Sequence, residues 1–313
     1  METPLSFWIL FHVVAFAVLA VDLYRKPGVV SFREAGIWCA VWVLLSLGFC
    51  AVVWQFKSPQ KAIEFLTGYV IEYSLSLDNV LVFVLVMEYF RVPAAHQHRV
   101  IFWGVFGAIV LRGGMIALGV ALVQRFHWVL YFFGAFLVFT GIKMLVSRDA
   151  EVDLANNRIL NLCKRWMPLT SDYRGAKFAV VEGGRLLFTP LALALIFVDF
   201  VDLVFAVDSI PAIFAITRDG FIVYTSNICA ILGLRSLYFL VAGAVRRLVY
   251  LKAGLACVLV LIGVKMLIAE WWAPPTWGAL LAVALILGIS AAASWLVQRT
   301  HLPSASQEDK LAP

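Results

Sequence analysis

Long stretches of this chain are almost entirely apolar, and its polar residues gather between them. A run of about 18 to 26 mostly apolar residues is long enough to cross the hydrocarbon core of a membrane as a helix. Nine such runs predict nine transmembrane helices, at about 6–24, 36–56, 65–90, 98–122, 128–147, 190–215, 222–245, 252–271 and 276–298. We therefore expect an all-α fold, a polytopic transmembrane helix bundle.

Composition excludes a water-soluble protein. Apolar residues make up 63% of the 313 positions, the mean hydropathy is +0.94, and only 14% of residues are charged, against roughly 25% in soluble domains. The predicted helices nearly fill the chain, so no soluble catalytic domain is expected. The sequence gives no reason to expect an enzyme.

The positive charges between the apolar runs predict an orientation, because cytoplasmic loops are enriched in Lys and Arg. If the N-terminus lies outside, the inner segments hold 17 Lys and Arg residues and the outer segments hold 4. The count predicts an outside N-terminus and a cytoplasmic C-terminus. It also explains the net charge of +6 without a nucleic-acid partner.

Two parts of the sequence are related to each other. The segment 65–83 can be laid over part of 193–213 at a constant offset of 130, which aligns it with 195–213 and places Glu72 on Asp202 and Asp78 on Asp208. Further on, AIVLR matches ILGLR and TGIKML matches IGVKML. Each copy would hold three helices, an odd number, so the copies enter the membrane from opposite sides, as the inverted repeats of secondary transporters do.

This repeat divides the chain into six parts. They are two N-terminal helices (1–64), a first three-helix repeat (65–147), a basic cytoplasmic loop (148–189), a second three-helix repeat (190–271), a last helix (272–298) and a disordered tail (299–313).

Carboxylates inside apolar helices are the candidate functional groups. Each costs about 2.5–3.5 kcal/mol near the bilayer centre, so five of them require compensation. The five are Glu72, Asp78, Asp199, Asp202 and Asp208. Arg112 and Arg235, also within helices, could neutralise two of them in structural pairs. The rest would need protonation, Lys143 or Lys265, or a bound cation.

The ligand chemistry favours a hard divalent cation. The expected ligands are carboxylate, amide and carbonyl oxygens, which suit Mg²⁺, Ca²⁺ or Mn²⁺ better than Zn²⁺ or Cu⁺. Asn79 could add an amide oxygen, and Asn227 could either approach this site or cap its helix. Residues six apart point about 120° away from each other on a helix. Glu72 and Asp78 therefore need a broken helix, or a site shared between the two copies.

The segments EYSLSLDNVLVF, FVDFVDLVFAVDSIPAIFAIT and TSNICAILGLRSLYFL closely resemble the TerC family of bacterial membrane proteins and, within it, the Alx-like subgroup. The resemblance covers roughly residues 6–298. It implies a nine-helix protein of the cytoplasmic membrane that exports Mn²⁺. The ligand chemistry leaves Ca²⁺ and Mg²⁺ as alternative ions, and protons that titrate the same carboxylates are a candidate coupling ion. The metal-site residues that it implies are Glu72, Asp78, Asp202 and Asp208, with Asn79 and Asp199 beside them, and the supporting residues are Asn227, Ser209, Arg112 and Arg235.

Two other functions stay open at this point. The chain could be a membrane partner that delivers metal to secreted enzymes or assists the secretion machinery, with the basic loop as its docking surface. It could also be an intramembrane protease with two catalytic aspartates, although no familiar protease motif accompanies them. Besides the lipid bilayer and a divalent cation, the partners left open are a second copy of the chain and the secretion machinery.

Overall fold

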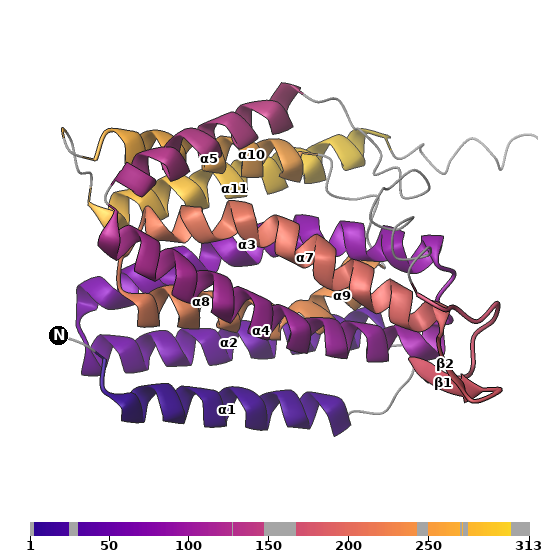
Figure 1. The fold of residues 1–313 in the computed structure, drawn as a ribbon. Coiled ribbons are helices and arrows are strands. Elements are labelled where there is room, and N and C mark those ends of the chain that lie inside the picture. The colour runs from indigo at the N-terminus through magenta and orange to yellow at the C-terminus, as the bar shows by residue number, and fades with distance from the viewer. Residues whose placement is uncertain are drawn as a thin grey trace, which may run out of the picture.

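The computed structural model describes residues 3–24, 31–126, 128–146, 167–242, 250–269, 271 and 275–301. Its helices run side by side along one common direction (Figure 1). The ten helices described are α1 (Leu5–Tyr24), α2 (Phe32–Phe56), α3 (Pro59–Tyr89), α4 (Ala94–Arg125), α5 (Trp128–Val146), α7 (Pro190–Phe214), α8 (Gly220–Leu232), α9 (Leu234–Ala242), α10 (Leu251–Leu267) and α11 (Thr276–His301). The fold is all-α, as predicted, apart from one short hairpin.

Each of the nine predicted apolar runs forms a helix in the described structure, but the seventh is broken. Its two parts, α8 and α9, are bent by 42° relative to each other, and Gly233 separates them. Six of the described helices are long and apolar enough to cross a membrane, or seven if α8 and α9 form one bent span. Nine spans, and the outside position of the N-terminus, therefore stay predictions.

Side-chain caps fix where several helices begin. Ser58 accepts a hydrogen bond from the backbone N–H of Lys61 at 3.1 Å, and Pro59 follows at the first helical position of α3. Asp219 accepts bonds from Phe221 N and Ile222 N at the start of α8. Such caps satisfy backbone donors that the first helical turn leaves without partners. Because α3 starts at Pro59, it begins six residues before the start at residue 65 that the apolar pattern predicts.

The centre of the bundle is formed by α3 and α7, the helices that carry the acidic residues. They pack on each other, and α3 also packs on α8 while α7 packs on α4. At one edge α5 packs closely on α10, and at the opposite edge lies α1 (Figure 1). α3 and α7 are the first helices of the two repeats, and each packs on the second helix of the other repeat, α3 on α8 and α7 on α4. This reciprocal packing is expected if the two repeats are related by symmetry. The inverted relation of the repeats stays a prediction.

Glycines allow α5 and α10 to touch through their backbones. A Cβ atom on Gly263 would lie 2.7 Å from the carbonyl oxygen of Gly134, and one on Gly141 would lie 2.8 Å from that of Ala256. Helices within membranes associate through such small-residue contacts, because lipid supplies no hydrophobic force between them.

A β-hairpin interrupts the predicted basic loop. Strand β1 (Ala179–Glu182) pairs with β2 (Arg185–Phe188) in antiparallel register, and Gly183 and Gly184 form the turn with φ angles of 58° and 77°. Positive φ at both central residues is the requirement of a type I′ hairpin turn. The Gly-Gly pair between two apolar runs would have predicted this hairpin from sequence.

The segment before the hairpin is attached to the turn between α3 and α4. The hydroxyl of Tyr173 donates a hydrogen bond to the carbonyl of Phe90 at 2.6 Å. Burial raises the pKa of Tyr173, which keeps this donor protonated. The guanidinium of Arg99 lies over the ring of Phe178, 5.2 Å from its centre. The part of the loop before residue 167 and the tail after residue 301 lie outside the described residues.

Candidate functional site

One arginine joins acidic residues from both sequence repeats. Arg112, on α4, is 0% exposed and donates from Nε and Nη2 to the two carboxylate oxygens of Asp202, at 2.9 and 2.7 Å. Its Nη1 donates to Glu72 Oε1 and to Asn227 Oδ1, the latter at 3.3 Å. The predicted buried arginine–carboxylate pair is therefore present, and it includes two acids.

A close approach of helices places these groups together. Gly68 lies one turn before Glu72 on α3, and a Cβ atom there would lie 2.9 Å from Ser226 Oγ. Glycine therefore lets α8 lie directly against α3 at Ser226, and Asn227 is the next residue. Asn227 lies within α8, which Asp219 caps, so of its two predicted roles the capping role is wrong.

Two residues that bind Arg112 each have a second buried polar atom without a hydrogen-bond partner among the described residues, Glu72 Oε2 and Asn227 Nδ2. The hydroxyls of Ser76 on α3 and Ser209 on α7 are also buried without a described partner. A buried polar atom without a partner costs about 1–3 kcal/mol. These atoms are therefore free, as far as the described residues go, to bind water or the water molecules around a cation.

Asp199 approaches the same region from the α4 side of α7. A Cβ atom on Gly107 would lie 2.8 Å from each carboxylate oxygen of Asp199, so the carboxylate lies directly against the backbone of α4 and would have to shift if Gly107 were replaced. Asp199 Oδ1 is buried without a described hydrogen-bond partner. Among the described contacts, Arg112 binds two carboxylates, Glu72 and Asp202, while Asp199 lies one turn before Asp202 on α7.

The remaining predicted residues are distributed along α3, α7 and α9. Asn79 and Arg235 are buried. Asp208 is half-buried on α7 and near Thr140 and Lys143 of α5. Asp78 belongs to α3, but its side chain lies outside what the structure describes. Its predicted role stays a prediction.

The described residues do not place three carboxylate, imidazole or thiol groups where together they could hold a metal ion. Glu72 and Asp202 both contact the guanidinium of Arg112. Glu72 and Asp78 cannot lie on the same face of one helix. Glu72 instead meets Asp202 of the second repeat at Arg112, so for Glu72 the site is shared between the two repeats.

A further buried carboxylate was not among the sequence predictions. Glu64 is 7% exposed on α3 and accepts hydrogen bonds from Lys61 Nζ at 2.7 Å and from Thr217 Oγ1 at 2.5 Å. It lies eight residues before Glu72, about two helical turns, near the end of the bundle where α7 ends. The apolar pattern missed it because the predicted helix began at residue 65.

Electrostatics decides what the Arg112 site can do. A bidentate arginine–carboxylate pair is among the strongest charge-assisted hydrogen bonds, but Arg112 carries one positive charge and contacts two carboxylates, those of Glu72 and Asp202. Buried charge without compensation is expensive. With both carboxylates ionised, the group of Glu72, Asp202 and Arg112 carries one negative charge in excess, so the predicted cation site stays a prediction that these charges do not oppose.

Comparisons with known proteins identify the family of the chain. The family described as "Integral membrane protein TerC family" matches residues 57–302. An uncharacterised membrane protein from Myxococcus xanthus, STKORF319, is 47% identical over 96% of this chain and 95% of its own length. A relative from Escherichia coli K12 is 45% identical over 92% of this chain and 91% of its own, and its name describes a candidate membrane-bound redox modulator, Alx. No solved structure gives a significant match. The chain belongs to the TerC family of integral membrane proteins.

Proposed function

We propose that this protein is a membrane transporter that exports manganese(II) from the cytoplasm through its intramembrane carboxylates. The observation that carries the proposal is the meeting of Glu72 and Asp202, from two related helices, on the one guanidinium of Arg112. Ionisable residues at membrane depth typically mark ion pathways. A site at the interface of two related helix groups is also typical of secondary transporters.

In this proposal Arg112 and the transported ion compete for the same carboxylates. In the described conformation the guanidinium binds Glu72 and Asp202. An arriving divalent cation brings twice the charge and accepts several oxygen ligands, so it can take the carboxylates from the arginine. When the ion leaves, the return of Arg112 compensates the acids again and prevents an empty site from carrying buried negative charge.

Protons provide the coupling in this proposal. Carboxylates bind a metal ion in their ionised form, so metal binding releases protons and weakens as the pH falls. Alternation between protonated and metal-bound carboxylates would exchange H⁺ for Mn²⁺ as the two helix groups move against each other. The choice of manganese and the outward direction rest on the resemblance to Alx-like members of the family.

The arrangement supports a transporter better than an intramembrane aspartic protease. A protease dyad needs two carboxylates that share a proton. Asp202 instead gives both oxygens to Arg112.

Transport by inside-out membrane vesicles tests the proposal. Asp202→Asn removes the charge but keeps the size of the side chain. We expect this variant to lower Mn²⁺ uptake by at least about tenfold, the lower limit of the loss in activity that is typical when a residue that supports a metal site is replaced. Asp219→Asn is the matched control, because Asp219 pairs with Lys57 near the end of the bundle and not with Arg112. Unaltered uptake by the Asp202 variant would refute the proposal.

The second candidate function, a docking partner for metal delivery or secretion, is favoured by one observation. The hairpin presents the cross-strand pair Val181 and Leu186, 70% and 53% exposed. Replacing both by Lys should leave Mn²⁺ transport by the purified protein intact. A variant that transports normally but no longer supports the secreted enzymes would favour the docking function.

A further inference from the structure

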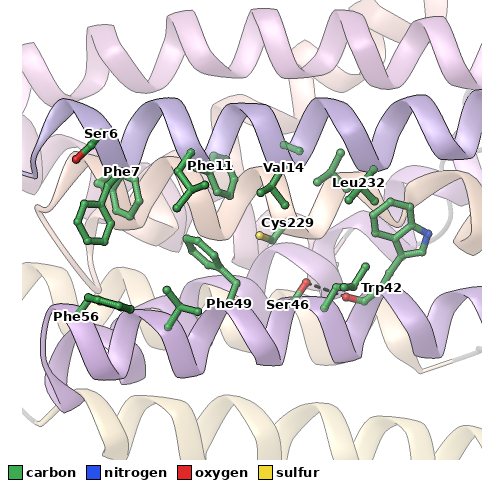
Figure 2. A pocket seen from close by; sticks show the side chains of 16 residues that line it. Ser6, Phe7, Phe11, Val14, Trp42, Ser46, Phe49, Phe56, Cys229 and Leu232 are labelled. Carbon is green, nitrogen blue, oxygen red and sulfur yellow. Dashed lines mark hydrogen bonds between the residues drawn. The ribbon is translucent and has the colours of Figure 1, made fainter.

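An apolar cavity of about 450 Å³ lies between α1 and α2, with α8 as its floor. Figure 2 shows side chains from α1 and α2 pointing into it from opposite sides. The floor is buried: Trp42, Cys229 and Leu232 are each less than 10% exposed. The rim is open, because Leu10 and Leu45 are 60% and 50% exposed.

The helices on either side meet at this cavity through aromatic rings. The ring centres of Phe7 and Phe56 are 5.8 Å apart, and those of Phe11 and Phe49 are 5.2 Å apart. These two contacts lie toward the end of the bundle where α2 ends. Toward the other end Val14 and Trp42 face the open space (Figure 2).

A second cavity, of about 400 Å³ and with polar residues in its wall, adjoins the first at the end of α2. The two share Phe7 and Phe56 in their walls. The polar cavity is lined by Lys57, Lys61 and Asp219, together with Thr3, Pro4 and Ser58. Lys57 pairs with Asp219 and Lys61 pairs with Glu64, each at 2.7 Å. Lysines at the end of a membrane helix lie at the depth of lipid phosphates.

The order of the two cavities matches one kind of molecule. An apolar tail followed by a polar, anionic head is the structure of a phospholipid. We propose that one phospholipid binds here, with an acyl chain in the cavity between α1 and α2 and its phosphate beside Lys57 and Lys61. An ammonium has three N–H donors. The described side-chain bonds use two of them on Lys57 and one on Lys61.

Size argues against a helix of another protein as the occupant. A transmembrane helix about 10 Å wide and 30 Å long fills on the order of 2,000 Å³. The apolar cavity has less than a quarter of that volume. A single hydrocarbon chain can enter it, whereas a helix cannot.

The bound chain would rest on the helix that carries Asn227. Cys229 and Leu232 form part of the floor, and a Cβ atom on Gly233 would lie 3.3 Å from Trp42. Gly233 is the break between α8 and α9. The lipid would therefore support α8 next to its bend.

Native mass spectrometry of the full chain, purified in mild detergent, tests the proposal. Leu45→Trp fills the cavity, and Leu44→Trp is the matched control, because Leu44 is 66% exposed and does not line the cavity. We expect one phospholipid bound to the wild-type protein and to the Leu44 variant, and at least a tenfold lower bound fraction in the Leu45 variant. Equal retention by both variants overturns the proposal, as does a bound molecule without phosphorus.

A second measurement does not depend on how the variants fold. A phospholipid with a photoreactive diazirine on its acyl chain is added to the wild-type protein, and the excess is washed out with detergent before illumination. We expect retained labelling at Leu10, Val14 and Leu45, and loss of labelling at Leu285 and Ile289, which are exposed on α11 outside the cavity. Labelling that falls equally at both sets of residues overturns the proposal.

Discussion

Replacing Arg112 by Gln tests whether one guanidinium compensates the buried acids. The change leaves Glu72 and Asp202 without the cation that binds both of them. Removing one partner of a buried ion pair typically costs about 3–5 kcal/mol. We expect the variant to lose that much free energy of unfolding in the absence of divalent metal.

Manganese should restore part of this loss. A ligand that binds only the folded protein stabilises it by about 2.7 kcal/mol at one hundred times its dissociation constant. In the variant the ion no longer competes with Arg112 for the carboxylates. We therefore expect saturating Mn²⁺ to stabilise the Arg112→Gln protein more than it stabilises the wild type.

The assay is unfolding of the purified protein in mixed detergent micelles, with MnCl₂ or with a chelator. Arg125→Gln is the control, because Arg125 ends the same helix and is exposed. Its effect should stay within about 0.5 kcal/mol. Arg112→Lys keeps the charge but loses the bidentate geometry, and it should fall between the two. The reasoning is refuted if Arg112→Gln is as stable as the control, or if Mn²⁺ stabilises the variant and the wild type equally.

Three further changes probe the packing that places the site. Gly107→Ala puts a methyl group 2.8 Å from both oxygens of Asp199 and should lower the free energy of unfolding by about 1–3 kcal/mol through overpacking. The control, Gly114→Ala on the same helix, meets nothing within 4 Å and should not destabilise the protein. Equal unfolding midpoints for the two variants would contradict the placement of Asp199. Gly141→Ala should separate α5 from α10 at a similar cost, measured by unfolding, with Gly288→Ala as the neutral control. Thr217→Val removes the hydroxyl that donates to Glu64 and should cost about 1 kcal/mol; no change in stability would show that this bond contributes nothing.

The sequence predicted the fold class and all nine helical segments, because long apolar runs in a membrane have few alternatives to a helix. It did not predict the break at Gly233, because a single glycine within an apolar run does not distinguish a broken helix from a continuous one. It also missed the hairpin at Gly183 and Gly184, because apolar patterns dominated the interpretation.

The sequence predicted which residues belong to the candidate site, but not how they contact one another. Glu72, Asp202 and Arg112 were all identified, since charged residues within apolar helices are unusual. Their common contact was not predictable, because it depends on the close approach of α8 to α3 at Gly68 and of α7 to α4 at Gly107. Glu64 was missed because its helix extends beyond the apolar run.

Equilibrium binding of Mn²⁺ to the purified full-length protein tests the central claim most directly. The account predicts one saturable site whose affinity falls as the pH is lowered, since protons and the ion compete for the carboxylates. The double change Glu72→Gln and Asp202→Asn should weaken that site by at least about tenfold. Binding that is independent of pH and unchanged in the double variant would contradict an intramembrane carboxylate site for the ion.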